Sequence, residues 1–156
     1  MIIFDAFSGI WGFSLALQQV IWKENVTFWF SENDKFAKQI YLENFPNAKD
    51  LGELNYVDLS SLPDFDLLTG WFPCQPFSNA GKWLWKNDKR WKYIYKLLEI
   101  LYKKQPKYFV FENVKWFLNE KHKDIRNETF NKINNLWYNF NYKILNTKDY
   151  WLPQTK

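Results

Sequence analysis

The stretch that decides the fold is IIFDAFSGIWG, residues 2–12. Ile2 to Phe7 is a short and almost wholly apolar run, which is typical of a strand buried in a sheet. Ser8-Gly9 ends this run, and apolar residues then recur at helical spacing from Phe13 to Ile21. A strand, a glycine turn and a helix in this order predict the opening unit of a parallel α/β sheet.

The rest of the chain repeats this alternation. Further strands are expected from Val26 to Ser31, Phe65 to Thr69 and Lys107 to Phe111, and helices from Asp34 to Asn44, Arg90 to Lys104 and Ile125 to Leu136. Tyr138 to Leu145 alternates like an edge strand, and Gly70 to Asn87 reads as a long loop of the kind that carries function. These elements predict a Rossmann-like α/β domain, a mostly parallel sheet with helices on both faces.

Length and composition narrow the class of protein. A chain of 156 residues with 47% hydrophobic and 24% charged residues is expected to form one soluble domain. There is no apolar run of about 18 residues and no signal-like N-terminus, so a cytoplasmic protein without membrane contact is expected. The net charge of +4 permits a polyanionic partner without arguing for one. With one Cys and one His, neither an internal disulfide nor a zinc site is expected.

The first candidate site is the glycine turn. A turn of this kind lets the backbone approach a nucleotide-type ligand, and Glu32, twenty positions after Gly12, is placed to accept hydrogen bonds from ribose hydroxyls. The alternative is a tight strand-to-helix turn with a solvated glutamate, and this motif alone leaves both interpretations open.

Two further residues with reactive side chains follow predicted strands. Cys74 stands between Pro73 and Pro76 after the strand at 65–69, and Glu112 follows the apolar run at 107–111. Each has a simpler interpretation, Cys74 as a small buried hydrophobe and Glu112 as a helix-capping acid. Because parallel strands end at one sheet edge, we expect a thiol nucleophile, a partly solvated proton donor and a nucleoside cofactor to share one cleft.

These segments together resemble the DNA cytosine-5 methyltransferases. The resemblance rests on Asp5-Ala6-Phe7-Ser8-Gly9, Ser31-Glu32, Gly70 to Ser78 with its Pro-Cys-Gln motif, and Glu112-Asn113-Val114. It implies transfer of a methyl group from S-adenosyl-L-methionine to C5 of a cytosine flipped out of double-stranded DNA, in a bacterial restriction-modification system. It further implies that Cys74 attacks C6, that Glu112 protonates N3 and that Arg90 holds the target or the DNA backbone.

The resemblance also implies a set of cofactor-binding residues. Glu32 would hold the ribose, and Glu53, where the family usually has Asp, would hold the adenine. The full expected set is Phe7, Gly9, Ile10, Trp11, Gly12, Glu32, Asn33, Glu53, Leu54, Trp71 and Pro73.

The chain departs from the family pattern in length. The family continues past Lys156 with a basic segment, further strands, a target-recognition region and a last segment of the cofactor pocket. Either the gene is truncated or a second polypeptide supplies the C-terminal half. Two alternative functions remain open: an RNA (tRNA) cytosine methyltransferase of the same fold, and a non-catalytic remnant that binds nucleic acid or a partner subunit.

The second departure is the ten Trp and five Gly. Trp11, Trp71, Trp116 and Trp151 stand where the family has glycine, and the other six also occupy positions where glycine reads naturally. We interpret this pattern as UGA codons that the source organism reads as glycine, with drift in a decaying gene as the alternative. An indole is expected to project into the cofactor cleft and to strain a positive-φ backbone at Trp11 and Trp71. The chain as written is therefore expected to be inactive and poorly folded.

Overall fold

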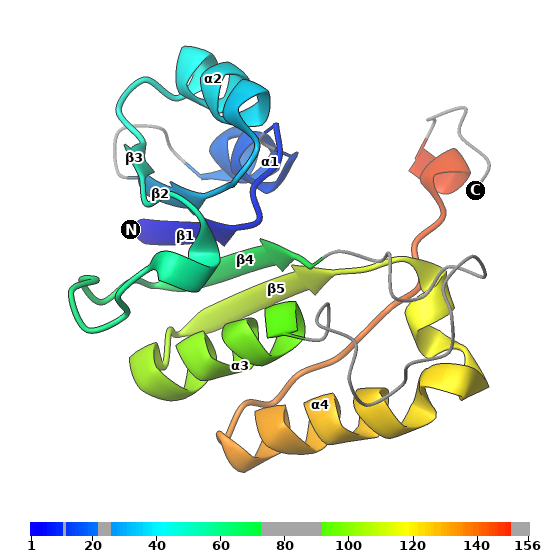
Figure 1. Ribbon diagram of the computed structural model, residues 1–156. Coiled ribbons are helices and arrows are strands. Elements are labelled where there is room, and N and C mark those ends of the chain that lie inside the picture. Colours follow the sequence, from blue (N-terminus) through cyan, green and yellow to red (C-terminus); the bar gives the residue numbers. More distant parts are fainter. Residues whose placement is uncertain (11, 22–25, 73–91, 151–156) are drawn as a thin grey trace.

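The computed structural model describes residues 1–10, 12–21, 26–72 and 92–150 (Figure 1). In these ranges one all-parallel sheet has the strand order β3-β2-β1-β4-β5. Its strands are β1 (Ile2–Ala6), β2 (Thr27–Ser31), β3 (Lys49–Asp50), β4 (Leu67–Trp71) and β5 (Tyr108–Glu112). The prediction of a Rossmann-like α/β sheet is therefore confirmed.

Helices cover both faces of the sheet. Figure 1 shows α1 (Gly12–Val20) and α2 (Lys35–Asn44) on one side, and α3 (Lys92–Lys104) and α4 (Lys123–Asn135) on the other. Short 3-10 turns lie at Leu54–Tyr56, Lys115–Leu118, Glu120–His122 and Thr147–Tyr150. None of the helices in the described ranges has the length and apolar character that crossing a bilayer requires.

Alternation along β1 divides the apolar core into two layers. Ile3 faces α1 and α2 and belongs to a cluster with Phe30 and Tyr41, whose rings are stacked with centroids 4.0 Å apart. Phe4 points to the opposite face and packs in a larger cluster with residues of α3, such as Leu97. Because successive side chains of a strand point to opposite faces, the central strand is buried on both sides.

Helix α2 begins where the sequence predicts. The side chain of Asp34 accepts hydrogen bonds from the backbone N–H groups of Phe36 (2.9 Å) and Ala37 (2.8 Å). These are two of the N–H groups that a helix N-terminus leaves without an intrahelical partner. The predicted cap is confirmed.

The prediction of an edge strand from Tyr138 to Leu145 is wrong. The segment is extended, but no backbone hydrogen bond joins it to β5 within the part of the chain that the structure describes. Side chains separate the two segments: the Tyr138 hydroxyl donates to the Pro106 carbonyl (2.6 Å), and the Tyr138 ring lies 5.2 Å from that of Phe109. A cavity of about 390 Å³ lies between β5, α4 and residues 138–142.

Trp71 and Trp137 differ in whether their backbone is strained. Trp71 lies in β4 with 52% of its surface exposed and without a positive φ, so the strain predicted there is wrong. A strand conformation accepts any side chain, which is the reason for this outcome. Trp137, directly after α4, has φ +66° and is 94% exposed. That is the position after a helix where glycine is favoured.

Candidate functional site

The candidate site lies where β1 meets the turn that follows it. β1 pairs with β2 on one side and with β4 on the other, and the helices that follow β1 and β4, α1 and α3, lie on opposite faces of the sheet. A crevice at the carboxyl ends of parallel strands, at a point where the strand order reverses, is the usual ligand position in open α/β sheets. The sequence-predicted turn at residues 7–12 stands at this position.

The backbone of the turn is tightly curved. Phe7 has φ +56° and Gly9 has φ +55°. The N–H of Ser8 donates to the carbonyl of Ser31 at 3.2 Å, which fastens the turn to the end of β2. A Cβ atom built on Gly9 or Gly12 would meet nothing within 4 Å. The turn therefore presents bare backbone to open space.

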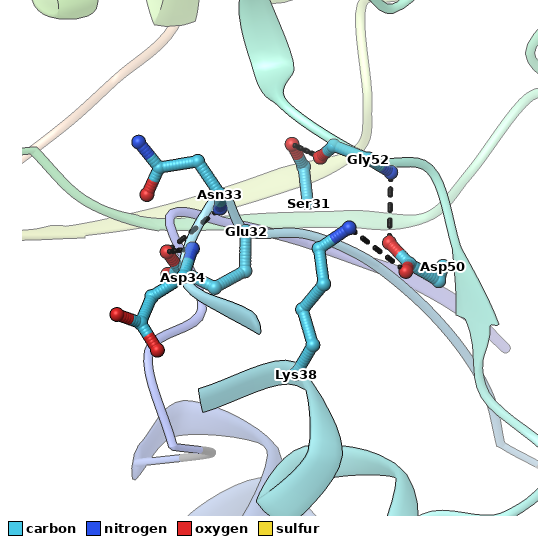
Figure 2. A network of polar contacts seen from close by, with 7 residues as sticks. All are labelled: Ser31, Glu32, Asn33, Asp34, Lys38, Asp50 and Gly52. Atoms are coloured by element: carbon cyan, nitrogen blue, oxygen red, sulfur yellow. Dashed lines mark hydrogen bonds and ion pairs between the residues drawn. The ribbon is translucent and has the colours of Figure 1, made fainter. Parts of the chain in front are cut away.

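Glu32 ties this turn to the end of β2. Its Oε2 accepts a hydrogen bond from the N–H of Gly9 at 2.9 Å. Its Oε1 accepts from the N–H groups of Asn33 (2.8 Å) and Asp34 (3.0 Å), as Figure 2 shows. Because a carboxylate offers about four lone-pair positions, the side chain retains acceptor capacity for a ligand in the turn.

A second set of bonds holds the segment after β3 against β2 (Figure 2). The Ser31 hydroxyl and the Glu32 N–H both donate to the Gly52 carbonyl, at 2.6 and 3.1 Å. The Gly52 N–H donates to Asp50 at 2.7 Å, and Asp50 pairs with Lys38 at 2.9 Å. These bonds fix the backbone that leads into Glu53.

Two predicted cofactor residues lie directly after that segment. The Glu53 carboxylate is half-buried and accepts a hydrogen bond from the Asn55 amide at 2.6 Å. Leu54 is 2% exposed and packs in the core. The side chain of Leu54 therefore packs in the core, and only its backbone is available to contact a ligand.

The other described residues of the turn differ in exposure. Phe7 is half-buried, and its ring meets that of Tyr93 edge-on with centroids 5.1 Å apart. Ile10 is 55% exposed, and Asn33 is exposed beside Glu32. Phe7 and Ile10 thus offer apolar surface in the turn, and Glu32 and Asn33 offer polar groups at the end of β2.

A buried carboxyl that sequence reasoning left without a role lies beneath the turn. Asp5 is 1% exposed and accepts hydrogen bonds from Ser14 of α1 (2.8 Å) and Thr69 of β4 (2.7 Å). The Ser14 hydroxyl is also 2.5 Å from the hydroxyl of Tyr41 in α2. Burial is the main cause that raises the pKa of Asp5 to about 6, and the Glu32 charge raises it further. A charged residue inside the apolar run IIFDAF is the sequence signal that marks this position.

Glu112 and Trp71 lie together at the carboxyl ends of β5 and β4. They are partners in the register of the two strands, and both are exposed. The partial burial predicted for Glu112 is therefore wrong, because β5 is the last strand of the described sheet. Next to Glu112, the Asn113 amide donates to the Phe72 carbonyl at 2.9 Å, which joins the two strand ends.

Four predicted site residues lie outside the described residues, namely Trp11, Pro73, Cys74 and Arg90. The described part of the predicted cleft contains the turn, Glu32 and Glu112 at one edge of the sheet. The bare backbone at Gly9 and Gly12, the acceptor Glu32 and the apolar Ile10 fit a nucleoside bearing an amino acid, as in S-adenosyl-L-methionine.

Comparison with known proteins gives one family over the full length of the chain. The model of the C-5 cytosine-specific DNA methylases matches residues 1–156. The type II methyltransferase M.NgoBI of Neisseria gonorrhoeae is 41% identical over 97% of this chain, and M.HaeII of Haemophilus aegyptius is 40% identical over 97%. The chain spans about half the length of these relatives, 47% and 46% respectively.

A solved structure is similar in fold. The crystal structure of a TehB-like SAM-dependent methyltransferase from Corynebacterium glutamicum superposes with a TM-score of 0.54. The match covers 86% of this chain and 64% of that protein, with 15% sequence identity. At this identity the likeness concerns the α/β fold alone.

Proposed function

The chain belongs to the C-5 cytosine-specific DNA methylase family, and from that premise we propose that it forms the half of a DNA cytosine-5 methyltransferase that holds the cofactor and the nucleophile. The observation that carries the proposal is the bare-backbone turn fastened to Glu32 at the strand-order reversal. Because the chain spans less than half of the relatives named above, the complete activity requires a further C-terminal region.

S-adenosyl-L-methionine is the proposed cofactor, and it supplies the methyl group. Gly9 and Gly12 admit it close to the backbone, and Glu32 accepts a hydrogen bond from a ribose hydroxyl with the one acceptor position that its three backbone bonds leave over. Glu53 and the N-terminal side of the 3-10 turn at Leu54–Tyr56 hold the adenine. Phe7 and Ile10 supply the apolar contacts.

The proposed chemistry depends on two side chains acting together. C6 of cytosine is a poor electrophile until an acid protonates or hydrogen-bonds N3, and Glu112 has this role. A thiol with a pKa near 8.5 is only partly ionised at neutral pH, so the Cys74 thiolate adds to C6 as Glu112 acts on N3. This addition moves an electron pair to C5, which accepts the methyl group while the donor sulfur becomes a neutral thioether. Loss of the C5 proton to a base then breaks the bond between C6 and the Cys74 Sγ, which leaves 5-methylcytosine and returns the thiolate. The base must leave the DNA stack for either atom to be reached.

Double-stranded DNA is the proposed substrate, with Arg90 as a contact to it. The family description names DNA, which favours DNA over the tRNA alternative. A DNA substrate also agrees with action in the cytoplasm. A second polypeptide is proposed as one way in which the missing C-terminal region is supplied.

The test uses the chain with glycine in place of its ten Trp, joined to the C-terminal half of M.NgoBI, because that relative is 41% identical over the region in question. We expect methyl transfer from labelled cofactor to duplex DNA and none to tRNA. Cys74→Ser is expected to abolish transfer while leaving cofactor binding nearly unchanged, since the thiol acts on the base. Glu112→Gln is expected to lower turnover less, because an amide still hydrogen-bonds N3 but cannot protonate it.

Three outcomes contradict the proposal in different ways. Transfer to tRNA alone reverses the choice of substrate. Equal loss of cofactor affinity and turnover in Cys74→Ser removes its role as nucleophile. Nucleic-acid binding without any methyl transfer, in a protein that binds cofactor, favours the non-catalytic remnant.

A further inference from the structure

Two carboxylates flank the cofactor turn without a basic partner. Asp5 lies beneath it with hydroxyl donors only, and Glu32 is bonded to backbone N–H groups. Within the described ranges neither carboxylate belongs to an ion pair, although the net charge of the chain is +4. The turn therefore carries negative charge, whereas the net charge of the chain is positive.

We propose that Asp5, acting with Glu32, makes the site prefer the positively charged methyl donor to the product of the reaction, whose sulfur carries no charge. This inference rests on the proposed function, because it deepens the role of the same turn. Asp5 acts here as a specificity-determining residue through its charge. It is too deeply buried to be a contact residue.

The groups that face Asp5 from the neighbouring elements leave its charge unbalanced. α1 contributes the Ser14 hydroxyl, β4 the Thr69 hydroxyl and α2 the Tyr41 hydroxyl behind Ser14. β2 places the apolar Phe30 opposite Asp5 in the strand register. The charge that acts on Asp5 from nearby is that of Glu32, and it is negative.

A cation in the turn relieves this repulsion. The sulfonium of S-adenosyl-L-methionine is such a cation, whereas the thioether of S-adenosylhomocysteine is not. The two ligands otherwise share the adenosine and amino-acid groups, so hydrogen bonds and packing contribute alike to both. Their affinity ratio therefore isolates the electrostatic part of binding.

The same argument predicts a pH dependence. Because burial and Glu32 raise the pKa of Asp5 to about 6, its carboxyl is mostly ionised at neutral pH and mostly neutral one unit below that value. Acidification should therefore remove the preference for the sulfonium. One unit charge that acts on another through a protein interior changes the affinity of a ligand by about tenfold.

The experiment is calorimetric titration with S-adenosyl-L-methionine and with S-adenosylhomocysteine, and it uses the 156-residue chain carrying Trp11→Gly and Trp71→Gly, so that no indole occupies the cofactor cleft. This chain is the reference, called the wild type below. In the wild type, the ratio of the two affinities should fall about five- to tenfold between about pH 7 and about pH 5. Asp5→Asn, which keeps the shape of the side chain, should have the lower ratio at both pH values. Glu32→Gln should lower the ratio and move its pH midpoint to lower pH, because the Glu32 charge raises the pKa of Asp5.

Thr69→Val is the matched control, because it removes one hydrogen bond to Asp5 and keeps the charge. It should retain a pH-dependent ratio, with the midpoint moved to higher pH. A purely structural role for Asp5 would lower both affinities by the same factor in Asp5→Asn.

A ratio that is equal at both pH values in the wild type overturns the inference, even if Asp5→Asn fails to fold. Absence of binding of both ligands at all pH values overturns the proposed cofactor and this inference with it.

Discussion

At the scale of single residues, the ionisation of Asp5 also affects folding. Its pKa rises from 3.8 to about 6 in the folded chain, mainly because the carboxyl is removed from water. A raised carboxyl pKa gives stability that is fully present below the unfolded value and is lost as pH rises through about 6. The shift corresponds to about 3 kcal/mol.

We therefore predict that Asp5→Asn removes a loss of stability that the wild type suffers between about pH 3 and about pH 7, because the folded and unfolded carboxyls differ in protonation between 3.8 and about 6. The measurement is urea unfolding across this range, and the difference between the two proteins isolates Asp5 from other titrating groups. His122, whose pKa is lowered by burial and by nearby positive charge, acts with the opposite sign and cancels in this difference. Parallel pH profiles for the two proteins would contradict the assignment.

Trp137 carries the clearest backbone argument for a glycine. It has φ +66° at the end of α4, and its side chain is 94% exposed, so no packing compensates for the strained conformation. Trp137→Gly should raise the free energy of unfolding by about 1 kcal/mol.

Trp29→Gly is the contrasting variant, because Trp29 packs against the core and the Lys49 ammonium lies 4.3 Å from the centroid of its ring. It should lower stability by about 2 kcal/mol. Equal effects of the two substitutions would remove the argument.

The tryptophans that replace family glycines predict a property of the gene. We expect UGA at the codons for Trp11, Trp71, Trp91, Trp116 and Trp151, with glycine in the natural protein. The physical reason is that a turn which must stay free of side chains does not accept the bulkiest residue. Sequencing the source gene decides this, and UGG at most of these codons would favour a decayed gene.

At the scale of elements, the packing of β4 on α3 depends on a small residue. A Cβ atom on Gly70 would lie 3.1 and 3.2 Å from the two terminal carbons of Leu97, which is fully buried and has little room to move. Gly70→Ala should therefore lower stability by about 1–2 kcal/mol in thermal unfolding.

Gly12→Ala is the matched control for this substitution. Its added Cβ meets nothing within 4 Å, and alanine is the better residue in a helix. Its stability should be unchanged or slightly higher, while its affinity for S-adenosyl-L-methionine should fall, since the turn is the proposed cofactor site. A larger loss of stability in Gly12→Ala than in Gly70→Ala would contradict this packing.

Helices and strands with a regular pattern of apolar residues were predictable from sequence, whereas contacts between these elements were not. The apolar run before Phe7 and the cap at Asp34 indicated β1 and α2 correctly, because burial and capping act over a few residues. The alternation of apolar and polar residues from Tyr138 to Leu145 gave a wrong prediction of a strand. A strand needs a partner within hydrogen-bonding distance, and the sequence pattern does not show whether one is present. The role of Asp5 depends on Thr69, far along the chain, and no local pattern joins the two.

At the scale of the whole molecule, the outer side of β5 is one of the two edges of the described sheet, and β3 forms the other. The cavity between β5 and residues 138–142 is lined along the whole strand, and aromatic rings such as Phe109 and Phe140 line it. Figure 1 shows this C-terminal segment running beside β5 on the side away from β4. An extended strand is the shape that fits between two extended segments.

We predict that joining the chain to the C-terminal half of M.NgoBI places a strand in this cavity. The outward-facing amides of Tyr108–Glu112 should then gain protection in hydrogen exchange, while the amides of β1, which is paired on both sides, should not change. Protection of the outward amides of β5 in the 156-residue chain alone would contradict this expectation.

The strand order has a consequence for synthesis of the chain on the ribosome. β1 is made first, yet the hydroxyl that bonds Asp5 from β4 lies 64 residues later. At ordinary translation rates this delay is roughly 3 to 13 seconds. During that time the buried central strand β1 has one unpaired edge, and pairing over such a separation is intrinsically slow. The newly made N-terminus is therefore the segment with the greatest need of a chaperone.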